Sequence, residues 1–389
     1  MKKLSDITKH LKQSDIRAVT AQINDVNGVN LGQGICDLPT PEPIRQAANH
    51  AINQSRSIYS YYGGIEELRS FILDKAVQFN RLPAETTDQV MVGNGSTGSF
   101  VTAVFTLLNP GDEVILFEPF YGYHSNILKI RDVVQRTVTL EPPAWSINFN
   151  ALESAITPKT KAVILNTPTN PTGKVWSKEE LLRLVELVRH HDLFLLTDEV
   201  YEYMTYDGHQ HISPASLPGA WDRTVTLSSF SKTYNMTGWR MGYAIGPEEI
   251  IEKMGLMNDL FYICAPTPLQ YGLLGAKQLG EGYFTEMRRD YSEKRELFCS
   301  TLEEIGFDVH WPQGAYYTFA SFKPLAGHVN GFEDDQQACR TLIERAGVGS
   351  VPGSSFFTNP EDGRYYLRFC YAKTMKELKT ACRGLRKLV

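Results

Sequence analysis

The chain has 389 residues, of which 42% are hydrophobic and 21% charged, and its formal net charge is −5. This composition is typical of a soluble globular protein with room for two domains, and it offers no basic face for general nucleic-acid binding. The six cysteines include no Cys-x-x-Cys pair, so neither a disulfide framework nor a metal site is predicted. The start MKKLSDITKHLKQS lacks the apolar core of a secretory signal, and no run approaches the ~20 apolar residues of a membrane span. We expect a cytoplasmic protein with neither nucleic acid nor membrane as a partner.

Short β-branched runs alternate with helical patterns from about residue 89 onward. The expected strands cover residues 89–92, 113–117, 162–166, 193–198, 224–229 and 241–246. The clearest helix is expected at 177–191, where Ser177 and Glu180 form a capping box at its start. Alternating strands and helices predict an α/β fold with a mostly parallel central sheet flanked by helices. Ligands bind at the carboxyl ends of such strands, and the polar residues expected there are Asn94, Glu118, Asn166, Asp198 and Ser229.

The pattern changes after about residue 247. A long helix is expected at 281–303, followed by strands at 316–322 and 365–371. We interpret this part as a smaller α+β domain that residues from the N-terminus join. The expected division is an N-terminal arm with part of the small domain at 1–45, a large domain at 46–285 and a C-terminal small domain at 286–389.

The segment GNGSTG at 93–98 follows an expected strand and suits a phosphate, because glycines allow a tight turn and a helix start offers free N–H groups. A Walker A loop is excluded by Ser99, which stands where its lysine is required. A dinucleotide fingerprint, with Glu118 as the ribose-binding acid, would normally occupy the first unit of its domain. A ligand-free turn and the single phosphate of pyridoxal phosphate stay open as alternatives at this point.

The stretch LSSFSKTYNMTGWRMG at 227–242 supplies a lysine, Lys232, among hydroxyl residues and close to Arg240. Ser229 and Lys232 also match the Ser-x-x-Lys motif of penicillin-binding enzymes, but the Ser-Asp-Asn and Lys-Thr-Gly elements of those enzymes do not occur in the chain. A solvated loop lysine is the remaining alternative for this residue in isolation.

This stretch resembles the cofactor-lysine segment of class I aminotransferases, which are pyridoxal 5′-phosphate (PLP) enzymes of fold type I. Other motifs of that family follow in its order: LGQGICDLPTP, YSYYGGIEELR, GNGSTG, EPFYGY, NTPTNPTG, TDEVYEYM and YYLRFCYAK. The resemblance spans nearly the whole chain. Within the family, VNLGQG and YDGHQHISPASLP are most similar to the kynurenine aminotransferase, glutamine transaminase and cysteine-conjugate β-lyase branch.

The resemblance implies PLP as the cofactor and a role for each matched residue. Lys232 would bind the cofactor covalently and, once released by substrate, move the proton that transamination requires. Asp198 would pair with the pyridine nitrogen and keep it protonated. Asn170 and Tyr201 would hydrogen-bond the phenolic oxygen, and Tyr121 would stack on the ring. The implied catalytic residues are therefore Lys232, Asp198 and Tyr201.

The phosphate and the substrate carboxylate are each assigned their own residues by the resemblance. Arg368 would clamp the α-carboxylate with a bidentate fork that lysine cannot reproduce, with Gly34 and Asn170 beside it. Three positions depart from the family pattern, namely Ser96, Ser99 and Cys36, where relatives often have glycine, alanine and proline. The implied phosphate ligands are Gly95, Ser96, Thr97, Ser229, Arg240 and, from a neighbouring subunit, Tyr59.

The expected function is transfer of an amino group from an L-amino acid to a 2-oxo acid by a ping-pong mechanism, in a homodimer with shared active sites. Tyrosines near the expected site and the branch resemblance favour aromatic, methionine- or glutamine-like substrates. The site tyrosines are Tyr61, Tyr62, Tyr123, Tyr316 and Tyr317. Alternatives are an aspartate aminotransferase, a cysteine-conjugate β-lyase at the same site, a PLP-binding regulator without catalysis and, remotely, an NAD-dependent dehydrogenase.

Overall fold

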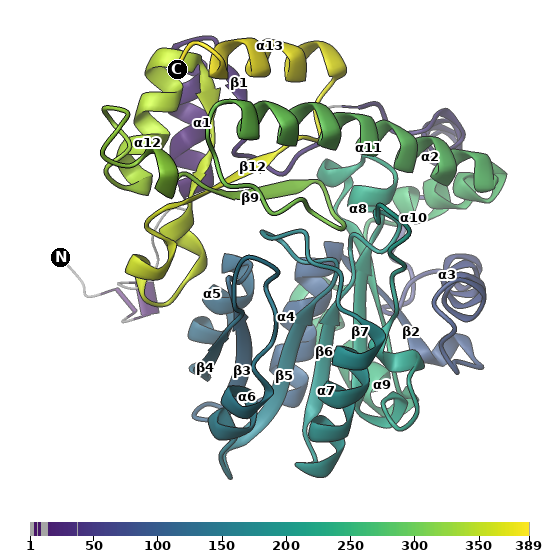
Figure 1. Ribbon diagram of the computed structural model, residues 1–389. Helices are drawn as coiled ribbons and strands as arrows, with labels where there is room; N and C mark the ends of the chain where they lie inside the picture. The colour runs from purple at the N-terminus through teal and green to yellow at the C-terminus, as the bar shows by residue number, and fades with distance from the viewer. Residues whose placement is uncertain (1–3, 6, 9–14, 37, 389) are drawn as a thin grey trace.

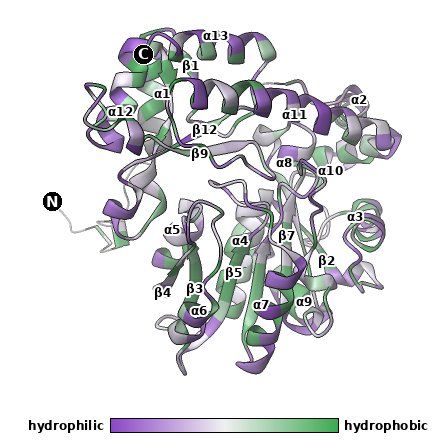
Figure 2. Cartoon of the chain, in the orientation of Figure 1, coloured by the Kyte–Doolittle hydropathy of each residue, from purple (hydrophilic) through white to green (hydrophobic). Residues whose placement is uncertain are grey.

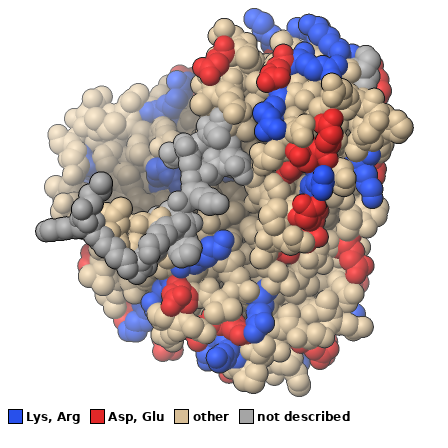
Figure 3. Space-filling view, turned by 90° about the vertical axis from the view of Figure 1, so that its left-hand side faces the viewer, with Lys and Arg blue, Asp and Glu red and all other residues tan. Residues whose placement is uncertain are grey.

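A computed structural model describes residues 4–5, 7–8, 15–36 and 38–388. In Figure 1 a sheet with its helices forms the lower part of the molecule, and the C-terminal segments form the upper part together with α1 and β1 from near the N-terminus. Among the described residues, no helix is long and apolar enough to cross a membrane. The face seen in Figure 3 carries acidic and basic side chains interspersed with one another.

The central sheet has seven strands in the order β2-β8-β7-β6-β5-β3-β4. The pairs among β4, β3, β5, β6 and β7 are parallel, whereas β8 runs antiparallel to both of its neighbours. The mostly parallel sheet that the sequence predicts is therefore confirmed. The strands are β2 (Val90–Asn94), β3 (Glu113–Glu118), β4 (Val134–Thr139), β5 (Thr160–Asn166), β6 (Phe194–Asp198), β7 (Thr224–Ser229) and β8 (Met241–Ile245).

Helices flank this sheet, and several pack directly on its strands, among them α4 (Gly95–Leu107) on β2, β7 and β8 and α9 (Glu248–Tyr262) on β2. The helix α7 begins after the capping box, in which Glu180 donates its backbone N–H to the Ser177 hydroxyl and accepts from the Ser177 N–H. The buried residues of α7 recur at helical spacing, and the strands β3 and β5 of the sheet are green, that is hydrophobic, in Figure 2. The α-helices between residues 42 and 273 are α2 (Glu42–Asn53), α3 (Glu66–Gln78), α4 (Gly95–Leu107), α5 (Gly122–Ile130), α6 (Phe149–Ala155), α7 (Lys178–His190), α8 (Phe230–Thr233), α9 (Glu248–Tyr262) and α10 (Thr267–Leu273).

The upper part is built on a three-stranded antiparallel sheet in the order β11-β12-β9. Residues from near the N-terminus join it, because β1 pairs in parallel with β10. The proposed division at residues 45 and 285 stays a prediction, and residue 285 lies in the first turns of α11. The elements are α1 (Asp15–Asp25), β1 (Val29–Asn30), α11 (Glu281–Glu304), β9 (Tyr317–Ser321), α12 (Asp335–Thr341), β10 (Val348–Gly349), β11 (Val351–Pro352), β12 (Tyr366–Cys370) and α13 (Met375–Leu385).

Candidate active site

A cavity of about 580 Å³ opens where the carboxyl ends of the central strands face the upper part. Its walls combine the ends of β5, β6 and β7, the starts of α4 and α8, and residues from β9, β12 and the N-terminal segment. Most of the predicted site residues line it, namely Gly34, Ser96, Thr97, Tyr121, Asn170, Asp198, Tyr201, Ser229, Lys232, Arg240 and Arg368.

Two predicted residues lie outside the cavity lining. Gly95 is the first residue of α4 and precedes Ser96, so its place is at the edge of the cavity. Tyr59 is 75% exposed on the surface. Tyr59, which was expected to serve a neighbouring subunit, is therefore exposed in this chain.

Asp198 ends β6, and its carboxylate is buried. One carboxylate oxygen has a hydrogen-bond partner and the other has none. Its Oδ2 lies 2.9 Å from the Nε2 atom of His124, and its Oδ1 is buried without a hydrogen-bond partner. The Asn166 amide donates to the Asp198 carbonyl at 2.9 Å and fixes the strand end. A buried carboxylate oxygen without a donor is costly, so this geometry suits a ligand that brings an N–H group.

Lys232 lies in the short helix α8, directly after β7. The Ser229 hydroxyl caps this helix by accepting the Ser231 N–H at 3.0 Å. The Lys232 Nζ donates to the Gly34 carbonyl at 2.9 Å. Burial, aided by the charges of Arg368 and Arg240, lowers the pKa of Lys232 from 10.5 to about 8. Roughly a tenth of the amine is then neutral at pH 7, which makes it available as a nucleophile and base.

A recess of the cavity lies where the start of α4 meets the segment after α8, since Ser96, Thr97 and Arg240 all line the cavity. Arg240 adopts a left-handed conformation with φ of 57°, and a Cβ atom at Gly95, whose φ is 73°, would lie 2.5 Å from the Arg240 Nη2. A Cβ atom at Gly242 would lie 2.4 Å from the Ser96 nitrogen. Gly95 therefore permits the helix start to approach the arginine closely, and Gly242 permits β8 to approach the helix start. The Ser231 hydroxyl is buried there without a partner.

Arg368 on β12 is 1% exposed. Its Nη1 donates to the Asn170 Oδ1 at 3.0 Å, and its Nη2 donates to the Gly32 carbonyl at 2.6 Å. The guanidinium lies over the Tyr317 ring at 4.6 Å. This arginine is held from two sides beside the cavity, as an arginine that binds a carboxylate requires.

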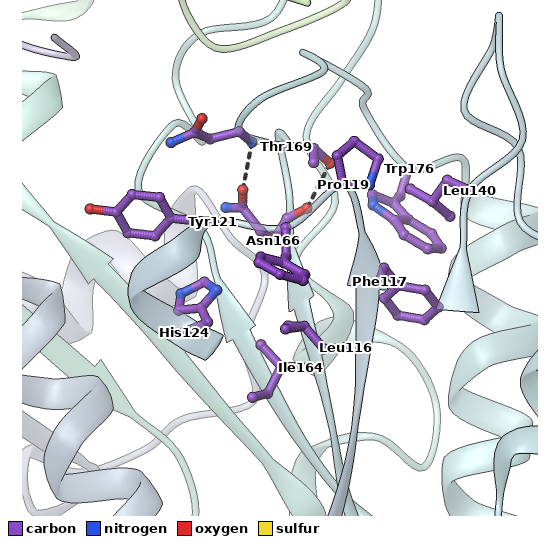
Figure 4. A pocket seen from close by; sticks show the side chains of 12 residues that line it. Leu116, Phe117, Pro119, Tyr121, His124, Leu140, Ile164, Asn166, Thr169 and Trp176 are labelled. Atoms are coloured by element: carbon purple, nitrogen blue, oxygen red, sulfur yellow. Dashed lines mark hydrogen bonds between the residues drawn. The ribbon is translucent and has the colours of Figure 1, made fainter. Parts of the chain in front are cut away.

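Tyrosines form much of the remaining wall. The hydroxyls of Tyr201 and Tyr317 lie 3.0 Å apart, and burial raises the pKa of Tyr201 well above its usual value, so it stays a hydroxyl donor. Figure 4 shows Tyr121 beside His124 and Asn166 at the strand ends. The rings of Tyr121 and His124 meet edge to face, with centroids 5.4 Å apart.

The chain is similar to known proteins over nearly its whole length. The family model "Aminotransferase class I and II" matches residues 26–385. The chain is 34% identical to aromatic-amino-acid aminotransferase 2 of Thermococcus litoralis, over 99% of this chain and 98% of that protein. It is 35% identical to an aspartate aminotransferase of Rhizobium meliloti, over 90% and 86% of the two.

The chain belongs to the class I and II aminotransferases. Its fold matches the structure of N-succinyldiaminopimelate aminotransferase from Mycobacterium tuberculosis with a TM-score of 0.95 and 31% identity, over all of both chains. The expected fold type and enzyme class are confirmed, and the dehydrogenase is excluded. Glu118, the acid which that alternative required, instead accepts hydrogen bonds from the Thr139 hydroxyl and the Thr358 N–H.

Class I aminotransferases of this kind use PLP, and the residues of this cavity fit that cofactor. The unpartnered Asp198 Oδ1 suits a protonated ring nitrogen. The recess between α4 and Arg240 offers helix N–H groups, hydroxyls and a positive charge to a phosphate. Lys232 lies in the same cavity with a lowered pKa.

Three residues of this aminotransferase site have no assigned role in the sequence prediction. His124, which contacts Asp198, stands alone in an otherwise ordinary helical segment, so its pattern carried no signal. Ser231 lies between two residues with assigned roles and could have been found from its position in the motif. Tyr317 was expected near the site, but its contact with Tyr201 required the fold that places β9 beside the loop after β6.

Proposed function

We propose that this aminotransferase prefers donors with uncharged, aromatic, methionine- or glutamine-like side chains. The observation that carries the proposal is the set of cations in the cavity. Among the described lining residues, the lysines and arginines are Lys232, Arg240 and Arg368, and we assign each of them to the cofactor or the α-carboxylate. A donor carboxylate in the side chain would find no further cation from this chain's lining. The tyrosines and Ile35 instead offer it ring and aliphatic surface.

The proposed division of labour follows from where each group lies. PLP, when bound, supplies an electrophilic carbonyl and an electron-poor ring that withdraws electrons from the substrate Cα. Lys232 would hold the cofactor and, as a neutral amine, would move the proton from Cα to the cofactor carbon that receives the amino group. Asp198, oriented by His124, keeps a proton on the ring nitrogen, and Arg368 holds the α-carboxylate.

Other residues of the site contact the cofactor ring and its phosphate, and one of them comes from a second copy of the chain. Tyr121 stacks on the ring, while Asn170 and Tyr201 donate to its phenolic oxygen. The exposed Tyr59 reaches the phosphate of a second copy of the chain, which makes a homodimer the working unit. The phosphate ligands from the chain itself are Gly95, Ser96, Thr97, Ser229 and Arg240.

A panel of amino donors against a fixed 2-oxo acid tests the proposed preference. We expect kcat/KM for phenylalanine, tyrosine or methionine to exceed that for aspartate by about tenfold or more, because an unpaired side-chain carboxylate would be desolvated without a partner. Equal or higher kcat/KM for aspartate would contradict the proposal. It would also indicate that a cation from outside this lining, such as one from a second subunit, completes the site.

A further inference from the structure

A second group of charged side chains is buried behind the active site. It consists of Glu199, Glu202, Lys75 and His211, which we call the rear cluster. Glu199 is 0% exposed and Glu202 is 3% exposed. The side chains of Lys75 and His211 are also largely covered. None of the four lines the active-site cavity, so the reaction does not explain why charge is buried there.

The two carboxylates of the rear cluster act only as acceptors. The Glu199 Oε1 accepts from the Thr197 hydroxyl at 2.7 Å and from the Ser213 hydroxyl at 2.9 Å, and its Oε2 lies 2.7 Å from the His211 Nε2. Each oxygen of Glu199 thus has a donor within the protein. The carboxylate is tied both to β6 and to the loop that follows Tyr206.

Glu202 joins more elements than any other member of the cluster. Its Oε1 accepts from the Ser228 hydroxyl at 2.9 Å and from the Tyr243 hydroxyl at 3.2 Å. Its Oε2 accepts from the Asn80 amide at 2.7 Å and lies 2.5 Å from the Lys75 Nζ. These partners come from β7, β8, α3 and the residues after α3. Lys75 supplies a positive charge directly beside the Glu202 carboxylate.

The rear cluster is connected to the active site through neighbouring residues. Glu199 directly follows Asp198, and Ser228 directly precedes Ser229. Because successive side chains in extended chain point to opposite faces, Asp198 and Ser229 face the cavity while Glu199 and Ser228 face the cluster. The Glu199 N–H also donates to the Leu227 carbonyl at 2.8 Å, which joins the two strand ends.

We propose that the rear cluster is a positioning framework for the cofactor, which holds the ends of β6 and β7 in register so that Asp198 and Ser229 reach it together. The inference rests on the proposed roles of those two residues. Glu202 is its central positioning residue, because it contacts the neighbour of Ser229 and anchors it to α3 and β8. Glutamine cannot reproduce it, because an amide carries no negative charge beside Lys75 and offers one acceptor oxygen where four groups donate to the carboxylate.

The test compares Glu202→Gln with Glu113→Gln, a matched control. Glu113 is a buried carboxylate at the opposite, amino end of the parallel strands, where it accepts from Arg136 and Thr157. We expect both substitutions to lower the thermal midpoint of the cofactor-free protein. Only Glu202→Gln should raise the Kd for PLP, by about tenfold, and reduce the visible circular dichroism of the bound cofactor, because a loosened strand end displaces the groups that orient it.

Two further variants decide the remaining outcomes. Ser228→Ala removes one hydrogen bond of the framework and should raise the Kd for PLP by a few fold. This variant tests the positioning role if Glu202→Gln does not fold. Wild-type Kd and dichroism in the folded variants would overturn the positioning role. Asp198→Asn distinguishes a failure of the positioning role from a failure of the proposed function. If the Kd of Asp198→Asn for PLP is also that of the wild type, the proposed role of Asp198 is wrong. If the Kd of Asp198→Asn is raised while the rear-cluster variants keep the wild-type Kd, only the positioning role is wrong.

Discussion

Replacing Lys232 by alanine is expected to lower kcat for transamination by about four orders of magnitude or more. The variant loses both the covalent attachment of PLP and the general base for the Cα proton, and positioned proton transfer alone contributes 10²–10⁴. Among the described residues lining the cavity, Lys232 is the single amine, and burial has already lowered its pKa to about 8. A steady-state assay of 2-oxo acid formation measures the loss.

The control for this variant is Lys174→Ala. Lys174 is also a buried lysine, but it pairs with Glu180 at 2.7 Å and does not line the cavity. We expect its kcat to stay within a few fold of that of the wild type. Turnover near the wild-type rate in folded Lys232→Ala would contradict the assignment of Lys232 as the catalytic amine.

The second large effect is expected for Arg368→Lys, which should raise KM for amino acid donors by about 10- to 100-fold. Lysine keeps the charge but loses the planar fork, and each charge-assisted hydrogen bond contributes ~1.5–3 kcal/mol. The shorter ammonium would also lose contacts with Asn170, Gly32 and the Tyr317 ring, which fix the guanidinium beside the cavity. Initial rates over a range of donor concentrations separate KM from kcat.

The matched substitution Arg364→Lys lies four residues away, where the arginine is partly exposed and pairs with Glu361 at 3.2 Å. Surface pairs of this kind contribute little, so its KM should match that of the wild type. The affinity of Arg368→Lys for PLP should also be unchanged, because Arg368 is assigned to the substrate. An unchanged KM in Arg368→Lys would show that another group binds the α-carboxylate.

The strands of the central sheet could be predicted wherever both of their faces are buried. Runs such as AVILN and LFLLTD are apolar without interruption, as buried parallel strands are, and they become β5 and β6. The edge strand β4 was missed because VQRTVT alternates and is half exposed. Its pairing with β3 depends on the fold around it.

Some residues of the site could be found from sequence motifs, and others could not. Lys232 and Asp198 lie in long, specific motifs, so their shared cavity could be anticipated from the sequence. His124 could not, because its contact with Asp198 joins two elements that only the folded sheet brings together. The left-handed backbone of Arg240 and its close approach to Gly95 are likewise properties of packing that residue patterns do not encode.

A single half-reaction tests the central claim most directly. The purified protein, loaded with PLP and freed of 2-oxo acids, is mixed with excess L-phenylalanine, and phenylpyruvate and ammonia are quantified while visible absorption is recorded. We predict one equivalent of phenylpyruvate per subunit, loss of the initial absorption band without ammonia, and its return when 2-oxoglutarate is added. No phenylpyruvate would contradict the proposed donor preference, and phenylpyruvate formed together with ammonia would contradict amino-group transfer at this site.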